Sequence, residues 1–312
     1  MKIIKDKSKQ KIIREIIQAI PPYSEELVDV SEIKRKYLDL DYCNIPNSKK
    51  LDIYLPDQGE GPFPVLIHLH GGGFIKGNKR DIQLKLPLKA RDIGFAIVSV
   101  DYSKSYEANY PKLVHEIKTS IRYLRSNAEK YRLNPQKIFV IGCSAGGHLA
   151  SLIGTSEGIQ ALEGGQYGYV EYSSGVQGAI SFCGSSNFLT MQHDLSEHLR
   201  KLELNAGMIY GESNSIDTLL FGKLVKSTPE LAKEFSSLTY VSKNIPEFLI
   251  VHGTHDNYVA PKQSIDLVQK IKEVGVGDKV ELHLLDGIGH CNKAFFSYAI
   301  PIMLKFLEKM NR

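Results

Sequence analysis

The sequence lacks most features that would indicate a membrane, metal-binding or redox protein. It has no tryptophan and only four cysteines among 312 residues. The cysteine spacing matches neither a zinc site nor a C-x-x-C motif, so we expect reduced thiols and no metal site. No apolar run approaches the ~18–20 residues that a membrane-spanning helix requires. These absences favour a globular chain without a membrane span.

A strong excess of charge is also absent. The 39 basic and 35 acidic residues give a formal net charge of +4. No dense Lys/Arg stripe interleaved with aromatic residues is present, so we expect no nucleic-acid partner. With 42% hydrophobic residues the chain can bury a sizeable core. Since α/β proteins of this length commonly form one unit, we expect a single domain over residues 36–312.

The N-terminal segment has a different pattern. The first 20 residues alternate apolar and charged side chains, with no unbroken apolar stretch and no small-residue cleavage site. A secretory signal peptide needs both, so we expect a cytoplasmic protein. Isoleucines recur there at helical spacing, which predicts an amphipathic helix that packs on the domain or a partner, or alternatively lies on a membrane surface. We assign residues 1–35, including the break at Pro21-Pro22, to an N-terminal helical extension.

Apolar strands alternate with amphipathic helices along the rest of the chain. Two opening strands, 37–45 and 51–55, have the alternation of an antiparallel pair. Strand and helix patterns then follow in turn, which predicts a mostly parallel sheet with helices on both faces. The strands are 64–70, 95–100, 137–141, 176–182, 248–251 and 280–285, and the helices are 113–124, 145–153, 262–274 and 293–307.

Within about residues 154–244 the alternation is mostly lost. Only the strand 176–182 continues it, and two further helices are predicted over 194–204 and 228–235. We interpret the remaining parts as insertions that form a small cap over a site.

The sequence contains the motif G-x-S-x-G in Gly142-Cys143-Ser144-Ala145-Gly146. It follows a predicted strand directly and precedes a predicted helix, which is the context of a strained turn that exposes a nucleophilic serine. Backbone N–H groups at the start of that helix favour negative charge. The sequence therefore predicts Ser144 as the nucleophile.

A glycine loop follows an earlier buried strand, in His70-Gly71-Gly72-Gly73-Phe74. Together with the residue after the nucleophile, such a loop supplies an oxyanion hole. We expect the backbone N–H groups of Gly72, Gly73 and Ala145 to serve as its donors. A phosphate-binding loop is the alternative, but no Lys-Ser/Thr follows the glycines. We expect His70 to brace the loop.

A serine hydroxyl needs a base, and the base needs an acid that orients it. His290 lies in a glycine-rich loop after the last predicted strand, and Asp256 follows the preceding strand. The order Ser144, Asp256, His290 is the one found in α/β-hydrolases. Asp286 is the rival acid, although it follows the histidine's own strand. This chemistry requires no metal and no organic cofactor.

The chain resembles the hormone-sensitive-lipase-like carboxylesterases, and within them the bacterial acetylxylan and feruloyl esterases. The likeness covers roughly residues 35–310 and rests on 51–56, 70–74, 99–102, 143–150, 229–232, 238–241 and Asp256 in G-T-H-D-x-x-V. Two residues depart from the subgroup. Phe74 stands where tryptophan is frequent, and Cys291 stands where glycine is common. The resemblance implies the α/β-hydrolase fold and hydrolysis of carboxylic esters through an acyl-enzyme.

We expect short acyl esters of the acetyl type, of saccharides or of aromatic acids, as substrates. The stretch Glu163–Gly175 is rich in Gly, Tyr and Ser, which suits sugar binding better than a lipid tail, unless it is a surface loop remote from the site. An amidase, peptidase or formamidase with the same triad is an alternative, and a non-catalytic ligand receptor is a remote one. The sequence leaves a homo-oligomer open.

Overall fold

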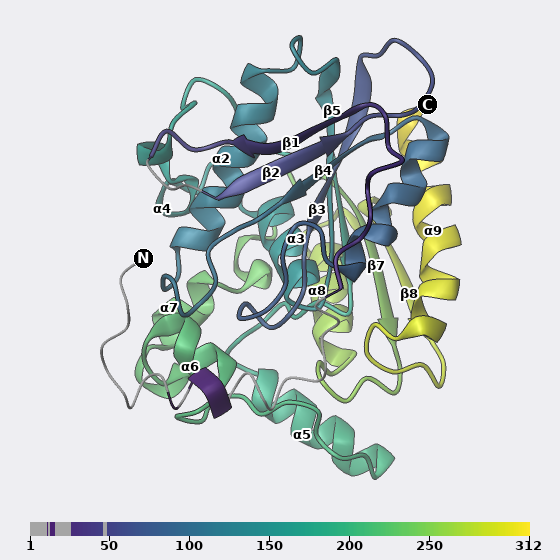
Figure 1. Ribbon diagram of the computed structural model, residues 1–312. Helices are drawn as coiled ribbons and strands as arrows, with labels where there is room; N and C mark the ends of the chain where they lie inside the picture. The colour runs from purple at the N-terminus through teal and green to yellow at the C-terminus, as the bar shows by residue number, and fades with distance from the viewer. Residues whose placement is uncertain (1–10, 12, 16–25, 46–48) are drawn as a thin grey trace.

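The computed structural model describes residues 11, 13–15, 26–45 and 49–312 of the chain (Figure 1). Most of the predicted N-terminal helix, with Pro21-Pro22, therefore lies outside the described residues. Within the described part, no helix combines the length and the apolar character needed to cross a membrane.

Eight strands form one sheet in the order β1-β2-β4-β3-β5-β6-β7-β8. β1 pairs with β2, and β2 with β4, in antiparallel register, whereas β3 to β8 run parallel. This confirms the predicted opening pair and the mostly parallel sheet. The bounds are β1 Lys36–Asp41, β2 Lys50–Tyr54, β3 Phe63–Leu69, β4 Ala96–Val100, β5 Leu133–Cys143, β6 Gly178–Phe182, β7 Glu247–Gly253 and β8 Val280–Leu285.

The central strands of the sheet are buried on both faces because they are apolar at consecutive positions. In β3 every residue is buried. Val65, Ile67 and Leu69 join one core cluster, while the intervening Leu66 joins the other. Side chains alternate across a strand, so an unbroken apolar run needs a cover on each side. Helices α2 (Lys112–Ser126), α3 (Ala145–Thr155) and α8 (Lys262–Glu273) cover one face, and α9 (Lys293–Asn311) with two 3-10 segments covers the other.

The helices agree closely with those expected from the sequence. The four that cover the sheet are α2 Lys112–Ser126, α3 Ala145–Thr155, α8 Lys262–Glu273 and α9 Lys293–Asn311. The two 3-10 segments beside α9 are η1 Ile82–Lys85 and η2 Pro87–Ile93.

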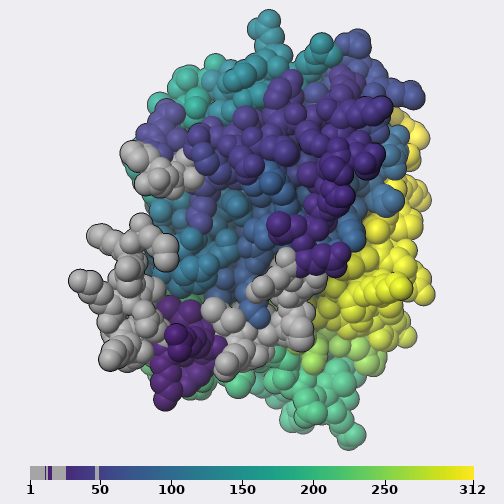
Figure 2. All heavy atoms as spheres, in the orientation of Figure 1, coloured from purple at the N-terminus to yellow at the C-terminus, as the bar shows by residue number. Residues whose placement is uncertain are grey.

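The predicted insertions form four short helices around β6. They are α4 Gln160–Glu163, α5 Met191–Leu202, α6 Ile216–Phe221 and α7 Pro229–Glu234. In Figure 1, α5 and α6 lie beyond the end of the sheet toward which β7 and β8 point. The segment that contains α5 projects from the bottom of the molecule in Figure 2. The segment with α5 and α6 thus lies at the carboxyl ends of the parallel strands, where α/β proteins usually bind ligands, whereas α4 packs against α2.

Candidate active site

Ser144 occupies the sharp turn between β5 and α3. Its φ of 56° and ψ of −119° lie in a region that residues with side chains rarely adopt. The flanking glycines make the turn possible. A Cβ on Gly142 would lie 2.3 Å from the carbonyl carbon of Gly146, and a Cβ on Gly146 would lie 2.0 Å from the carbonyl oxygen of Leu69. The turn therefore tolerates no larger residue at either glycine.

His290, the predicted base, lies within hydrogen-bonding distance of both the predicted nucleophile and the predicted acid. His290 Nε2 is 2.8 Å from Ser144 Oγ. His290 Nδ1 is 2.6 Å from Asp256 Oδ2. The rival acid Asp286 is exposed and accepts a hydrogen bond from the Thr254 hydroxyl at 3.2 Å. The geometry thus favours Asp256 as the partner of His290.

Asp256 is fully buried, and both of its carboxylate oxygens are hydrogen-bonded. Oδ1 accepts the backbone N–H groups of Tyr258 at 2.8 Å and Val259 at 2.9 Å. Oδ2 lies near two histidines, at 2.6 Å from His290 Nδ1 and 3.2 Å from His252 Nε2. Burial alone would raise the pKa of Asp256, but the charge of His290 and the bonds from both histidines hold it well below its usual range. The acid is therefore ionised.

The same carboxylate acts on His290. Burial lowers the pKa of the His290 imidazole, and the charge and hydrogen bond of Asp256 more than reverse this and raise it above its usual value. A carboxylate only accepts, so the proton of the neutral imidazole lies on Nδ1. Nε2 then faces Ser144 Oγ with a free lone pair. This is the tautomer that a general base for Ser144 requires.

Sequence reasoning missed His252, which lies inside β7 and is fully buried. Its Nδ1 is 2.7 Å from the Ser264 hydroxyl, and its Nε2 is 2.9 Å from the Val259 carbonyl. A carbonyl only accepts, so Nε2 carries the proton and also points it toward Asp256. A lone histidine in an apolar strand gives no signal of such a contact.

The predicted oxyanion-hole residues line the same cavity as Ser144 and His290. Gly72 and Gly73 have φ values of 98° and 61°, which glycine adopts readily. A Cβ on Gly72 would lie 2.6 Å from the Lys76 carbonyl oxygen, so the loop admits no side chain there. Ala145 is the first residue of α3, where backbone N–H groups lack partners within the helix.

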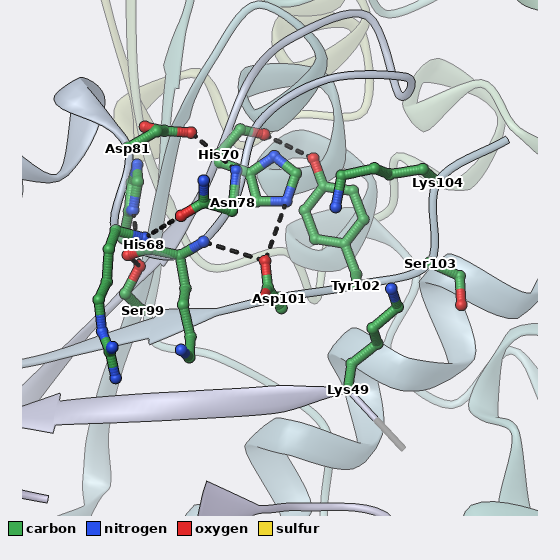
Figure 3. A network of polar contacts seen from close by, with 12 residues as sticks. Lys49, His68, His70, Asn78, Asp81, Ser99, Asp101, Tyr102, Ser103 and Lys104 are labelled. Atoms are coloured by element: carbon green, nitrogen blue, oxygen red, sulfur yellow. Dashed lines mark hydrogen bonds and ion pairs between the residues drawn. The ribbon is translucent and has the colours of Figure 1, made fainter. Parts of the chain in front are cut away.

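A polar network behind the glycine loop contains His70 (Figure 3). His70 Nδ1 is 2.9 Å from the Gly71 carbonyl, and its ring stacks on Tyr102 at 4.1 Å. The Tyr102 hydroxyl donates to the His70 carbonyl at 2.5 Å. Burial and the nearby charge of Lys104 hold the pKa of His70 well below its usual value. His70 is therefore neutral and fixed, as a brace should be.

The cavity at Ser144 has a volume of about 390 Å³. Its remaining walls include apolar residues that the insertions contribute. These are Phe188, Met191, Met208, Tyr210 and Ile216. Part of the insertions, from Phe188 to Ile216, therefore contributes to the walls of the site.

Of the two interpretations of Glu163–Gly175, a sugar-binding part of the site and a surface loop remote from it, the structure supports the second. None of the residues in this stretch lines the cavity at Ser144. The stretch instead borders a separate hollow of about 280 Å³, beside Arg122 and Glu157. Its Gly, Tyr and Ser content reflects a surface loop held by buried basic residues, since Arg122 donates to the carbonyls of Glu163 and Gly168. It gives no support for a preference among acyl groups.

The proteins that this chain resembles include esterases. A model of the BD-FAE family matches residues 51–271, well over half of the chain. The probable carboxylic ester hydrolase LipM of Mycobacterium tuberculosis is 26% identical over 274 residues, covering 85% of this chain and 60% of that protein. The acetyl esterase of Salmonella schwarzengrund is 41% identical over 86 residues, covering 28% of this chain and 27% of that protein.

Among solved structures, a bifunctional GH43-CE protein of Bacteroides eggerthii is similar, with a TM-score of 0.77 and 26% sequence identity. The match covers 88% of this chain and 35% of that chain. This chain spans from 47% to 60% of the length of the four curated relatives that match most of it.

Proposed function

Because this chain belongs to the BD-FAE family and has the α/β-hydrolase fold, we propose that it hydrolyses carboxylic esters with Ser144 as nucleophile. The observation that carries the proposal is the pair of hydrogen bonds that links Ser144 to His290 and His290 to Asp256. A serine, a histidine with a free Nε2 and a buried carboxylate form the working parts of a serine hydrolase. The names of the relatives support ester substrates.

The reaction proceeds in two halves. Ser144 Oγ attacks the ester carbonyl carbon while His290 Nε2 accepts its proton. The N–H groups of Gly72, Gly73 and Ala145 stabilise the oxyanion, and each such donor contributes about 3–4 kcal/mol to lowering the barrier. His290 then donates its proton to the leaving alcohol, which leaves an acyl-enzyme.

In the second half, His290 takes a proton from water, and the resulting hydroxide attacks the acyl carbon. The intermediate collapses with return of the proton to Ser144 Oγ, which releases the carboxylic acid. Asp256 stays ionised throughout and stabilises the imidazolium. No step requires a metal or an organic cofactor.

Short acyl esters of the acetyl type, on saccharides or aromatic compounds, are the proposed substrates. A cavity of about 390 Å³ is near the small end of the range for ligand sites. Polar groups of Gln83, Ser185 and Tyr258 line it beside the apolar cap residues, which suits an acyl group with a hydroxyl-bearing alcohol. The likeness to an acetyl esterase and to a bifunctional GH43-CE protein supports the same class.

Aryl esters of increasing acyl length test this proposal. We expect kcat/KM to be highest for p-nitrophenyl acetate or butyrate and to fall for octanoate and decanoate, because the cavity is too small for a long chain. A maximum at octanoate or beyond would contradict the short-chain assignment. Acetylated and feruloylated saccharides, compared at equal concentration, then identify the alcohol and acyl class.

Two further measurements test the chemistry itself. A fluorophosphonate probe should label the wild-type chain at Ser144 and leave Ser144→Ala unlabelled, whereas a non-catalytic receptor would not be labelled at all. Rates for p-nitrophenyl acetate and p-nitroacetanilide compare an ester with the matching amide. Faster cleavage of the anilide would replace the esterase assignment with an amidase.

A further inference from the structure

Three of the four cysteines gather around the histidine of the proposed triad. Cys143 precedes Ser144, Cys183 follows β6, and Cys291 follows His290. The Cys291 thiol contacts those of Cys143 and Cys183, and the Cys183 thiol in turn contacts His290. Cys43, by contrast, lies in the core cluster on the face covered by α2, α3 and α8. The proposed ester hydrolysis uses none of these thiols.

Two of the thiols and His290 have the geometry of a metal-binding group. The ligand atoms of Cys183, His290 and Cys291 all lie within 4.8 Å of one another. In a tetrahedral zinc site the Zn–S and Zn–N bonds of about 2.3 Å and 2.0–2.1 Å place ligand atoms roughly 3.3–3.8 Å apart. The three side chains would therefore need to close by only about 1 Å.

The chemistry of the donors selects the kind of ion. Two thiolates and an imidazole are soft to intermediate ligands, which favour Zn²⁺ or Cd²⁺ over Mg²⁺ or Ca²⁺. Cys183 is fully buried, and Cys291 lines the cavity, so an ion can reach the group from the substrate side. The motif spacing gave no sign of this group because its members come from two loops more than 100 residues apart.

We propose that Cys183, His290 and Cys291 form an inhibitory site for a thiophilic divalent cation such as Zn²⁺ or Cd²⁺. Binding replaces the protons of the two thiols, releases two H⁺ and uses a lone pair of the His290 ring, without transfer of electrons. An imidazole bound to the metal cannot accept the proton of Ser144. The metal therefore switches off the hydrolysis proposed above while leaving Ser144 in place.

Inhibition by Zn²⁺ and Cd²⁺ in a non-chelating buffer is the first test, with p-nitrophenyl acetate as substrate. We expect micromolar metal to reduce the wild-type rate at least tenfold and EDTA to restore it. Cys291→Gly and Cys183→Ser should each need at least about tenfold more metal for the same inhibition, relative to their own metal-free rates. Cys43→Ser, a buried thiol elsewhere, is the matched control and should respond like the wild type.

The Cys291→Gly variant is chosen because it should fold like the wild type. Cys291 has a φ of 38°, in the left-handed region that glycine adopts more readily than cysteine, so this variant should keep the loop. Cys183 also lies within 4.8 Å of ligand atoms of His252 and Asp256. Metal inhibition that survives Cys291→Gly but not Cys183→Ser would overturn the proposed ligand set in favour of that second one.

The inhibition test rests on the proposed esterase function. A binding measurement tests the metal site without it. Titration of Ser144→Ala with Cd²⁺ should give the ultraviolet charge-transfer band of cadmium thiolates with one ion per chain, and Cys183→Ser in that background should lack it. Absence of the band, or its persistence without Cys183 and Cys291, would refute the metal site alone. A wild-type chain that binds Cd²⁺ but hydrolyses no ester would refute the esterase alone.

Discussion

Among the described residues, the partly buried His290 and the fully buried His70 each face an aspartate, but at different distances. His290 Nδ1 lies 2.6 Å from Asp256, whereas His70 Nε2 lies 3.8 Å from Asp101. The Asp256 side chain is fully buried, and that of Asp101 is 23% exposed. The pKa of His290 is accordingly raised and that of His70 lowered. His290 is therefore suited to accept a proton, and His70 is not.

The partner of the unprotonated ring nitrogen explains why the two histidines differ. Both histidines direct Nδ1 at an acceptor, Asp256 for His290 and the Gly71 carbonyl for His70. Each neutral ring therefore has a bare Nε2. The bare nitrogen of His290 faces the Ser144 hydroxyl, which can donate to it, whereas that of His70 faces a carboxylate, which cannot. The partner at Nε2 is the reason why we propose His290 as the base and His70 as a brace.

The largest expected effect concerns the serine. Ser144→Ala should reduce kcat by about 10⁶, because removal of a triad nucleophile usually costs this much. Ser99→Ala is the matched control, since Ser99 Oγ likewise lies close to a histidine nitrogen, at 3.0 Å from Nδ1 of the buried His68. It should leave kcat near the wild-type value. If Ser144→Ala retained more than about a thousandth of wild-type kcat, the triad assignment would fail.

The next largest expected loss of kcat comes from replacing the aspartate that contacts His290. Asp256→Asn should lower kcat by about 10⁴, because an amide can donate to His290 and stabilise the wrong tautomer. Asp286→Asn and Asp101→Asn should each cost far less, since neither carboxylate is within hydrogen-bonding distance of His290 in the described structure. Steady-state rates of the three variants rank them directly. Equal losses in Asp256→Asn and Asp286→Asn would move the acid to Asp286.

The sequence predicted these residues because their order and local context are set by the fold. Strands β5, β7 and β8 are apolar enough to recognise, and parallel strands place the residues that follow them at one edge of the sheet. Ser144, Asp256 and His290 all follow such strands. The sharp turn at Ser144 can also be recognised from the sequence, since only glycine fits at positions 142 and 146.

Contacts between side chains from distant elements could not be predicted in this way. The approach of His252 to Asp256 and the cluster of Cys183 with Cys291 depend on loop paths that no periodicity encodes. The insertion within 154–244 shows the same limit. Several residues between 188 and 216 line the cavity. The stretch Glu163–Gly175, whose composition suggested sugar binding, does not. Composition identifies a loop but not the face of the molecule on which it lies.

The pH dependence of kcat/KM sharpens the comparison between the two histidines. His290 must be neutral to accept a proton, and Asp256 raises its pKa above the usual 6.5. Activity should therefore fall as pH drops through a value above 6.5. In Asp256→Asn the residual activity should persist to lower pH, since loss of the negative charge lowers the pKa of His290. Asp101→Asn should leave the acidic limb in place, because His70 stays neutral over this range.

The smallest expected effect tests whether His70 holds the glycine loop in place. Tyr102→Phe removes the hydroxyl that donates to the His70 carbonyl at 2.5 Å and keeps the ring that stacks on His70. The carbonyl is then left without this donor, and the glycine loop that begins at Gly71 should shift slightly away from its position beside Ser144. A misplaced oxyanion donor weakens binding of the transition state more than that of the ground state, so kcat should fall about tenfold with KM nearly unchanged, a barrier increase of about 1.4 kcal/mol. The acidic limb of the pH profile should stay where it is, since Tyr102 has no contact with His290 in the described structure. A shift of that limb in Tyr102→Phe would mean that the two histidine–aspartate pairs are coupled, and the separation of base from brace would no longer hold.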